Sequence, residues 1–92
     1  MEIEEIKKIV CDVVRIKPSE ISSASRKGHI MFARKSFVFY SFRKCANKEL
    51  IARIVSRALS QIYNYIETYP YYERDKTYGD MFNQIKDRIN EN

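Results

Sequence analysis

Residues 51–62 read Ile-Ala-Arg-Ile-Val-Ser-Arg-Ala-Leu-Ser-Gln-Ile, and the spacing of small and apolar residues in this stretch is the strongest indication of the architecture. Ala52 is small enough for a second helix to cross the first closely, and Ser56 follows where the chain must turn. Ile62 then provides an apolar anchor in the second helix. The spacing predicts two short helices joined by a tight turn, a helix-turn-helix over about residues 47–68.

Apolar residues recur at three- and four-residue steps on both sides of this motif, which is the pattern of amphipathic helices. Helices are expected at about 2–15, from 26 or 27 to 44, and at 48–55, 57–68 and 75–90, with Asn47 as the N-cap of the third. The residues expected to face inward are Ile3, Ile6, Val10, Val13 and Val14, then Ile30, Ala33, Phe37, Tyr40, Phe39 and Phe42, then Leu59, Ile62 and Ile66, and lastly Tyr78, Met81, Phe82, Ile85 and Ile89. With only 2 Gly and 2 Pro, the 92 residues predict one all-α domain, a compact bundle of about five helices.

Several classes of function find no support in the sequence. Cys11 and Cys45 form no CxxC motif and accompany a single His29, so both thiols are expected to be small apolar fillers, without a metal site. A glycine-rich phosphate loop and a nucleophile–base pair are both missing, so we expect no enzyme activity, cofactor or small-molecule substrate. Residues 1–8 are too charged for a signal peptide and no stretch is long enough to cross a bilayer, so a cytoplasmic location without membrane contact is expected.

Positive charge is concentrated in residues 26–57. This stretch contains nine of the 17 Lys and Arg residues but only one of the 12 Asp and Glu residues, so the rest of the chain is acidic on balance. The nine are Arg26, Lys27, Arg34, Lys35, Arg43, Lys44, Lys48, Arg53 and Arg57. A basic middle between acidic ends favours a protein that lays one surface on a polyanion.

The expected helix 57–68 has a polar outer side. Arg57, Ser60, Gln61, Asn64 and Thr68 recur there at three- and four-residue steps, and the first acid of the helix is Glu67. Donors and acceptors without a charge that repels phosphate are what a helix in the major groove of DNA requires. An ordinary solvated surface is the competing interpretation.

Three stretches, 25–35, 51–65 and 72–78, together resemble the C-terminal DNA-binding domain of the bacterial replication initiator DnaA, in its stand-alone or phage-type form. They are similar, in order, to the basic loop with the helix that follows it, to the turn with the GRDHSTVxHA signature, and to a tail rich in charge and tyrosine. The resemblance implies a Trp-repressor-like helix-turn-helix fold and binding to double-stranded DNA.

The resemblance also implies roles for single residues. Arg34 matches an arginine that enters the minor groove, Arg57 one that reads bases, and Ser60 a signature hydroxyl. The chain departs from the signature at four positions, where the family has aspartate, histidine, threonine and a second histidine; these are Ala58, Leu59, Gln61 and Asn64. The departures leave general DNA binding as the expectation and do not carry the DNA sequence of the family over.

The sequence therefore predicts double-stranded DNA binding, sequence-preferring, in replication or transcription control. Base contacts are expected from Arg57, Ser60, Gln61 and Asn64, and backbone or minor-groove contacts from Arg26, Lys27, Arg34, Lys35, Lys48 and Arg53. For these contacts to form one surface, Arg34 and Arg57 must lie on the same side of the molecule.

Three points stay open at this stage. The alternative function is a protein-interaction module that has kept the fold and lost DNA recognition, and an exposed Leu59 would favour it. A tyrosine cluster, Tyr69, Tyr71 and Tyr72, is expected to pack a loop against the helices, with single-strand stacking as the rival interpretation. The oligomeric state is not decided by any feature of the sequence.

Overall fold

The computed structural model describes residues 1–45 and 47–90, and within these ranges the chain is helical without a strand. The elements are α1 (Ile3–Val14), the short 3-10 helix η1 (Pro18–Ser22), α2 (Gly28–Cys45), α3 (Lys48–Val55), α4 (Leu59–Thr68), the short helix η2 (Tyr69–Arg74) and α5 (Gly79–Asn90). The all-α bundle of five helices that the sequence predicts is confirmed.

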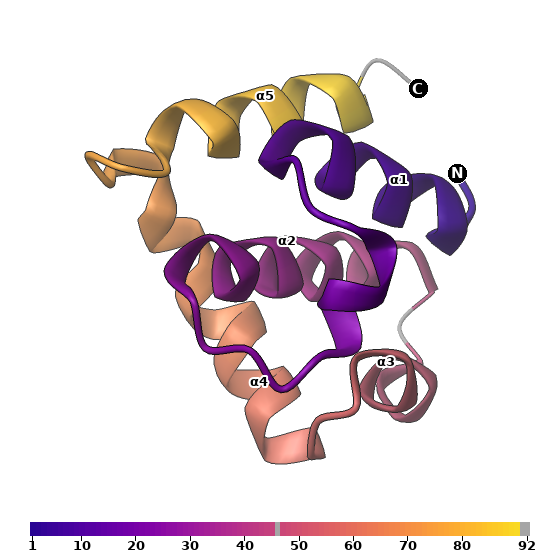
Figure 1. Ribbon diagram of the computed structural model, residues 1–92. Coiled ribbons are helices and arrows are strands. Elements are labelled where there is room, and N and C mark those ends of the chain that lie inside the picture. The colour runs from indigo at the N-terminus through magenta and orange to yellow at the C-terminus, as the bar shows by residue number, and fades with distance from the viewer. Residues whose placement is uncertain (46, 91–92) are drawn as a thin grey trace.

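Helix α2 is the centre of the molecule. It packs against α1, α3, α4, η1 and η2, and Figure 1 shows it running through the middle of the bundle. Helices α1 and α5 lie together on one side of α2, while α3 and α4 lie on the other. The C-terminal helix therefore leaves the outer side of α4 uncovered.

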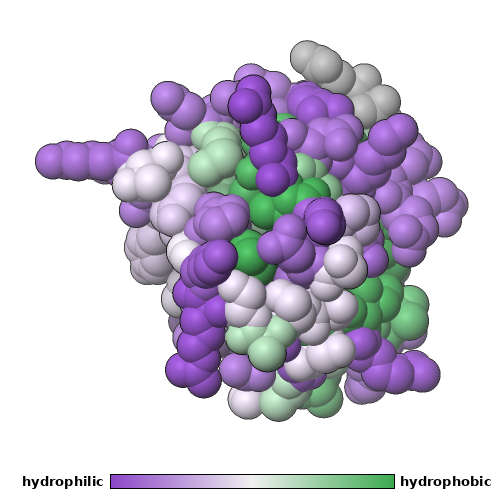
Figure 2. Space-filling model, viewed as in Figure 1, coloured by the Kyte–Doolittle hydropathy of each residue, from purple (hydrophilic) through white to green (hydrophobic). Residues whose placement is uncertain are grey.

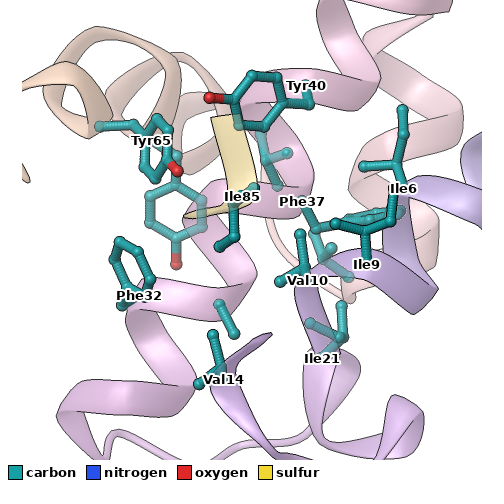
Figure 3. Packing of buried hydrophobic residues seen from close by; sticks show 14 of the residues in the cluster. Ile6, Ile9, Val10, Val14, Ile21, Phe32, Phe37, Tyr40, Tyr65 and Ile85 are labelled. Atoms are coloured by element: carbon teal, nitrogen blue, oxygen red, sulfur yellow. The ribbon is translucent and has the colours of Figure 1, made fainter. Parts of the chain in front are cut away.

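The core lies on both sides of α2, with α1 and α5 covering one side and α3 and α4 the other. Figure 3 shows Phe37 beside Ile9 and Val10 of α1, and Phe32 on the side of Tyr65. Most large apolar side chains are withdrawn from water here, and on the face drawn in Figure 2 hydrophobic residues show only in small areas. Burying that apolar surface is the main favourable term that holds such a bundle together.

The inner sides of α1, α2 and α5 follow the expected periodicity, but α4 differs. Ile62 is buried as expected, whereas Leu59 is exposed and Ile66 is half-buried. Tyr65 and Tyr69 are buried instead. The buried side of α4 runs through residues 62, 65 and 69, because α4 faces the aromatic side of α2. The expectation that Leu59 faces inward was therefore wrong.

The helix boundaries show two local differences from the expectation and one agreement with it. Helix α4 begins at Leu59, not at residue 57, so Arg57 lies in the turn before it. Helix α5 begins at Gly79, because Asp75 Oδ1 accepts hydrogen bonds from the amides of Thr77 at 2.8 Å and Tyr78 at 2.9 Å and holds a separate turn. The predicted cap of α3 is confirmed, since Asn47 Oδ1 accepts from the Leu50 amide at 3.1 Å.

Two further expectations are tested by burial. Cys11 is buried as a small filler, but Cys45 at the end of α2 is exposed, so the filler role was wrong for Cys45; both thiols are free. Of the tyrosine cluster, Tyr69 is buried and Tyr72 is half-buried against the ring of Phe32, whereas Tyr71 is exposed. Two of the three rings thus pack the loop, as expected, and are not open for stacking.

Candidate nucleic-acid interface

The turn between α3 and α4 is three residues long. Ser56 adopts the left-handed conformation with φ 56° and ψ 49°, and its amide donates to carbonyls in the last turn of α3. Ala58 is the N-cap of α4 and has no side-chain oxygen to accept a helix amide; Gln61 Oε1 accepts from the Ala58 amide at 3.2 Å. Gln61 therefore uses its carbonyl oxygen within the turn and keeps its amide nitrogen for other partners.

A cavity of about 450 Å³, which we call the basic cavity, lies between the start of α2 and the outer side of α4. Its lining consists of Arg26, Met31, Arg34, Lys35, Arg57, Ser60, Gln61, Asn64 and Tyr65. Seven of these nine are among the ten contact residues that the sequence indicates. Four are cations, and no Asp or Glu stands among the described residues of this lining.

Arg34 lines this cavity but is buried, with 1% of its surface exposed. Its Nε donates to the carbonyl of Ile21 at 2.8 Å, and its Nη2 donates to the carbonyl of Ser23 at 2.8 Å. Weaker bonds reach the carbonyls of Glu20 and Ser25 at 3.3–3.4 Å. This conformation differs from the expectation that Arg34 enters a minor groove, because its guanidinium is occupied by the loop.

Arg57 is half-buried and also binds backbone carbonyls. Its Nη1 donates to Val55 at 3.2 Å and to Ser56 at 3.0 Å, and its Nη2 donates to Ser23 at 2.8 Å. The two arginines expected on one side of the molecule thus converge on one loop. Both are turned toward backbone oxygens, however, and not outward.

Neither of these two guanidinium groups forms an ion pair with a carboxylate of the described residues. The ion pairs within the described residues are Lys86 with Glu73 at 3.9 Å and Arg88 with Asp12 at 3.8 Å, both away from the loop. Burial, followed by the neighbouring Arg57 cation, lowers the pKa of the Arg34 guanidinium from its usual value. Two positive charges are therefore held close together mainly by carbonyl dipoles, with the Tyr65 side chain as a further polar neighbour of Arg34.

The remaining cations of the predicted site lie at different places. Lys27 is exposed beside the cavity, in the loop before α2. Lys35 Nζ stands 5.6 Å from the ring centre of Tyr65 and 5.5 Å from that of Tyr72. Lys48 Nζ is 4.7 Å from the ring centre of Tyr63, on the other side of α4. The structure thus separates Lys48 from the basic cavity.

A second cavity, of about 560 Å³, opens on the α3 side of α4. It is lined by Glu49, Ala52, Arg53, Ser56, Arg57 and Leu59. Leu59 is 40% exposed and Tyr63 is 52% exposed. Arg53 belongs to this cavity and not to the basic cavity, and Arg57 borders both.

Three participants in the arrangement were not predicted: Met31 and Tyr65 in the lining of the basic cavity, and Ser23 in the loop before α2. Tyr65 lines the basic cavity, and its position three residues after Ile62 on the same helical side is a signal that could have found it. Ser23 takes part through its main-chain oxygen, which accepts from both arginines. A backbone acceptor has no side-chain pattern, so the sequence holds no signal for it.

The comparisons with protein-family models, with curated proteins and with solved structures found no match for this chain. None of the helices within the described residues is long and apolar enough to span a membrane. In the same part of the chain, no three His, Cys, Asp or Glu side chains are grouped so that they could hold a metal ion.

Proposed function

We propose that this protein binds double-stranded DNA, with α3 and α4 acting as the two helices of a helix-turn-helix and α4 entering the major groove. The observation that supports the proposal most is the basic cavity, which joins cations to hydrogen-bonding side chains without an acid in its described lining. DNA carries closely spaced phosphates beside base edges, and a binding surface needs both kinds of group.

The division of contacts in this proposal follows the exposure of each side chain. Ser60, Gln61 and Asn64 are exposed on α4 and are assigned to base edges. Arg26 and Lys27 are exposed in the preceding loop and are assigned to phosphates, with Lys35 beside them. Arg57 can reach a base only by giving up hydrogen bonds to its own turn. Arg34 is buried beneath the binding surface and makes no direct contact with DNA in this proposal; it holds the loop before α2 in place.

The salt dependence of duplex binding tests the proposal. If the three cations assigned to phosphates each neutralise one of them, the plot of log K against log salt has a slope of about −3. Arg26→Gln should lower the magnitude of the slope by about 1. Lys44→Gln removes the same charge at the far end of α2 and should leave the slope unchanged. A wild-type protein that fails to bind random duplex at low salt would refute the proposal.

A second candidate function is that of a protein-interaction module that has kept the fold and lost DNA recognition. The exposure of Leu59 favours it, because Leu59 and Tyr63 present apolar surface next to the second cavity. Loss of binding to a protein partner on Leu59→Ser, in a variant that keeps duplex affinity, would assign this surface to a protein. Absence of duplex binding by the wild type would make protein interaction the leading proposal.

A further inference from the structure

The basic cavity contains a charge that the protein itself does not neutralise. Arg34 is buried and Arg57 half-buried, and their hydrogen bonds within the described residues go to main-chain oxygens. A cation withdrawn from water costs free energy unless an opposite charge or several dipoles compensate it. Carbonyl dipoles supply hydrogen bonds here but no net negative charge, so the region keeps a positive potential.

The open side of the cavity carries donors that remain available. The side chains of Arg26, Ser60 and Asn64 make no hydrogen bond to other described residues, and Gln61 keeps its amide nitrogen. Lys35 adds an ammonium group above two tyrosine rings. The donors come from the loop before α2, from α2 itself and from α4, so they approach the cavity from several directions.

We propose that the basic cavity is a binding site for a single tetrahedral oxoanion of the phosphate class. Arg34 and Arg57 act as positioning residues, since they fix the loop and supply the positive potential. Arg26, Lys35, Ser60, Gln61 and Asn64 supply the hydrogen bonds. The inference deepens the duplex proposal and rests on it for one source of the ligand, a backbone phosphate; free inorganic phosphate is the other source.

The geometry favours a phosphate group over a planar carboxylate. A tetrahedral anion presents acceptor oxygens in several directions, and charged donors that surround an anion form short, strong hydrogen bonds with it. The volume of about 450 Å³ exceeds what one phosphate group fills, so room remains for the sugar atoms attached to an esterified phosphate.

Thermal unfolding in inorganic phosphate tests the site without any DNA. At constant ionic strength, phosphate about fivefold above its Kd should raise Tm by about 4–8 °C relative to chloride. Phosphate also stabilises proteins by exclusion from their surface, but that effect acts equally on single-charge variants. Arg26→Gln and Lys35→Gln should lose most of the shift, while Lys44→Gln should retain it. Equal shifts in all four proteins would overturn the inference.

A spectroscopic measurement makes the result independent of stability. In a ¹H–¹⁵N NMR titration with inorganic phosphate, the chemical shifts of the Gln61 and Asn64 side-chain amides should change in the wild type and in Lys44→Gln. The same chemical shifts should not change in Arg26→Gln. Chemical-shift changes that are spread over the whole surface would count against a defined site.

A parallel titration with a labelled random duplex separates this inference from the proposed function. Duplex binding together with equal phosphate effects in all variants would overturn the oxoanion site and leave the duplex proposal standing. Phosphate binding at the site without duplex binding would support the inference with free phosphate as the source, and would refute the duplex proposal. Competition between phosphate and duplex at constant ionic strength would identify the backbone phosphate as the ligand.

Discussion

Arg34 and Arg57 donate to the same oxygen atom, the carbonyl of Ser23, each at 2.8 Å. Arg34 comes from the middle of the central helix α2, and Arg57 comes from the turn between α3 and α4. Their shared acceptor ties the loop before α2 to α2 itself and to the turn of the proposed motif. The position of Arg26 and Lys27 relative to the outer side of α4 therefore depends on two arginines that turn away from solvent.

The first prediction concerns the stability that Arg34 provides. Arg34→Met should lower the free energy of unfolding by about 3–5 kcal/mol, because several loop carbonyls lose their donors in a buried place. Arg34→Lys keeps the charge but loses the planar fork, so we expect it to recover only part of the loss. Urea denaturation measures all three proteins. Arg53→Met, at an exposed position, should change stability by less than about 0.5 kcal/mol, and an equally small effect at Arg34 would contradict the structural role.

The second prediction separates base reading from phosphate binding. Arg57→Ala should weaken binding to a duplex selected from random oligonucleotides by about 1–3 kcal/mol and relax the preference at one base position. Lys27→Ala should weaken all duplexes by a similar factor, because a phosphate contact carries no sequence information. Fluorescence anisotropy on selected and random duplexes gives both values. Equal losses on the two duplexes for Arg57→Ala would defeat its base-reading role and leave it as a positioning residue.

The third prediction uses the uncapped start of α4. Ala58 occupies the N-cap without an acceptor, so Ala58→Ser and Ala58→Asp should each stabilise the fold by about 0.5–2 kcal/mol. The two variants should differ in DNA binding, since a carboxylate beside the basic cavity repels phosphate and a hydroxyl does not. Thermal unfolding and duplex titration of both proteins test this pair. A duplex affinity that Ala58→Asp leaves unchanged would argue against phosphate contact near the turn.

Much of the fold was predictable because local patterns agree with the packing. The capping side chain of Asn47 and the turn at Ser56 are local signals, and both elements occur where the sequence places them. The boundaries of α4 and α5 were less accurate. Each depends on a turn whose hydrogen bonds compete with the helix, as Asp75 shows by capping the residues before Gly79.

The candidate site was predictable in part of its membership but not in its geometry. Charge and helical spacing in the sequence identified ten contact residues, and seven of them line one cavity in the structure. The direction of Arg34 could not be read from the sequence, because its partners are main-chain carbonyls in a loop nine to fourteen residues away. Leu59 was misplaced for a related reason: which edge of α4 faces the core is set by the rings on α2, not by the apolar residues of α4 alone.

The fourth prediction concerns the left-handed turn. Ser56 has φ 56°, a conformation that costs about 1 kcal/mol or more for a residue with a Cβ atom and nothing of the kind for glycine. Ser56→Gly should therefore raise or keep stability despite the more flexible unfolded chain, while Ser56→Val should lower it by more than about 1 kcal/mol. Urea denaturation of the two variants is the measurement, and a destabilised glycine variant would mean that the hydroxyl itself contributes.

The last prediction is that the protein loses stability at alkaline pH, mainly because of the buried hydroxyl of Tyr69. Burial is the main cause that raises the pKa of Tyr69 far above its usual value, and burial also raises the pKa of Tyr40 and of Tyr72. An unfolded tyrosine releases its proton near pH 10, so above about pH 10 the unfolded state binds fewer protons than the native state and stability falls as the pH rises.

Tyr69→Phe removes one of these protons and should reduce the slope above about pH 10 by about 1.4 kcal/mol per pH unit. At neutral pH the same variant should change stability by no more than about 1 kcal/mol, because the buried hydroxyl has Ser36 and Tyr40 as polar neighbours but no described residue within good hydrogen-bond geometry. Tyr71→Phe, at an 80% exposed position, should leave the profile unchanged. Urea denaturation between about pH 7 and 11 gives the three slopes, and parallel curves for wild type and Tyr69→Phe would show that Tyr69 is not the group that couples stability to pH.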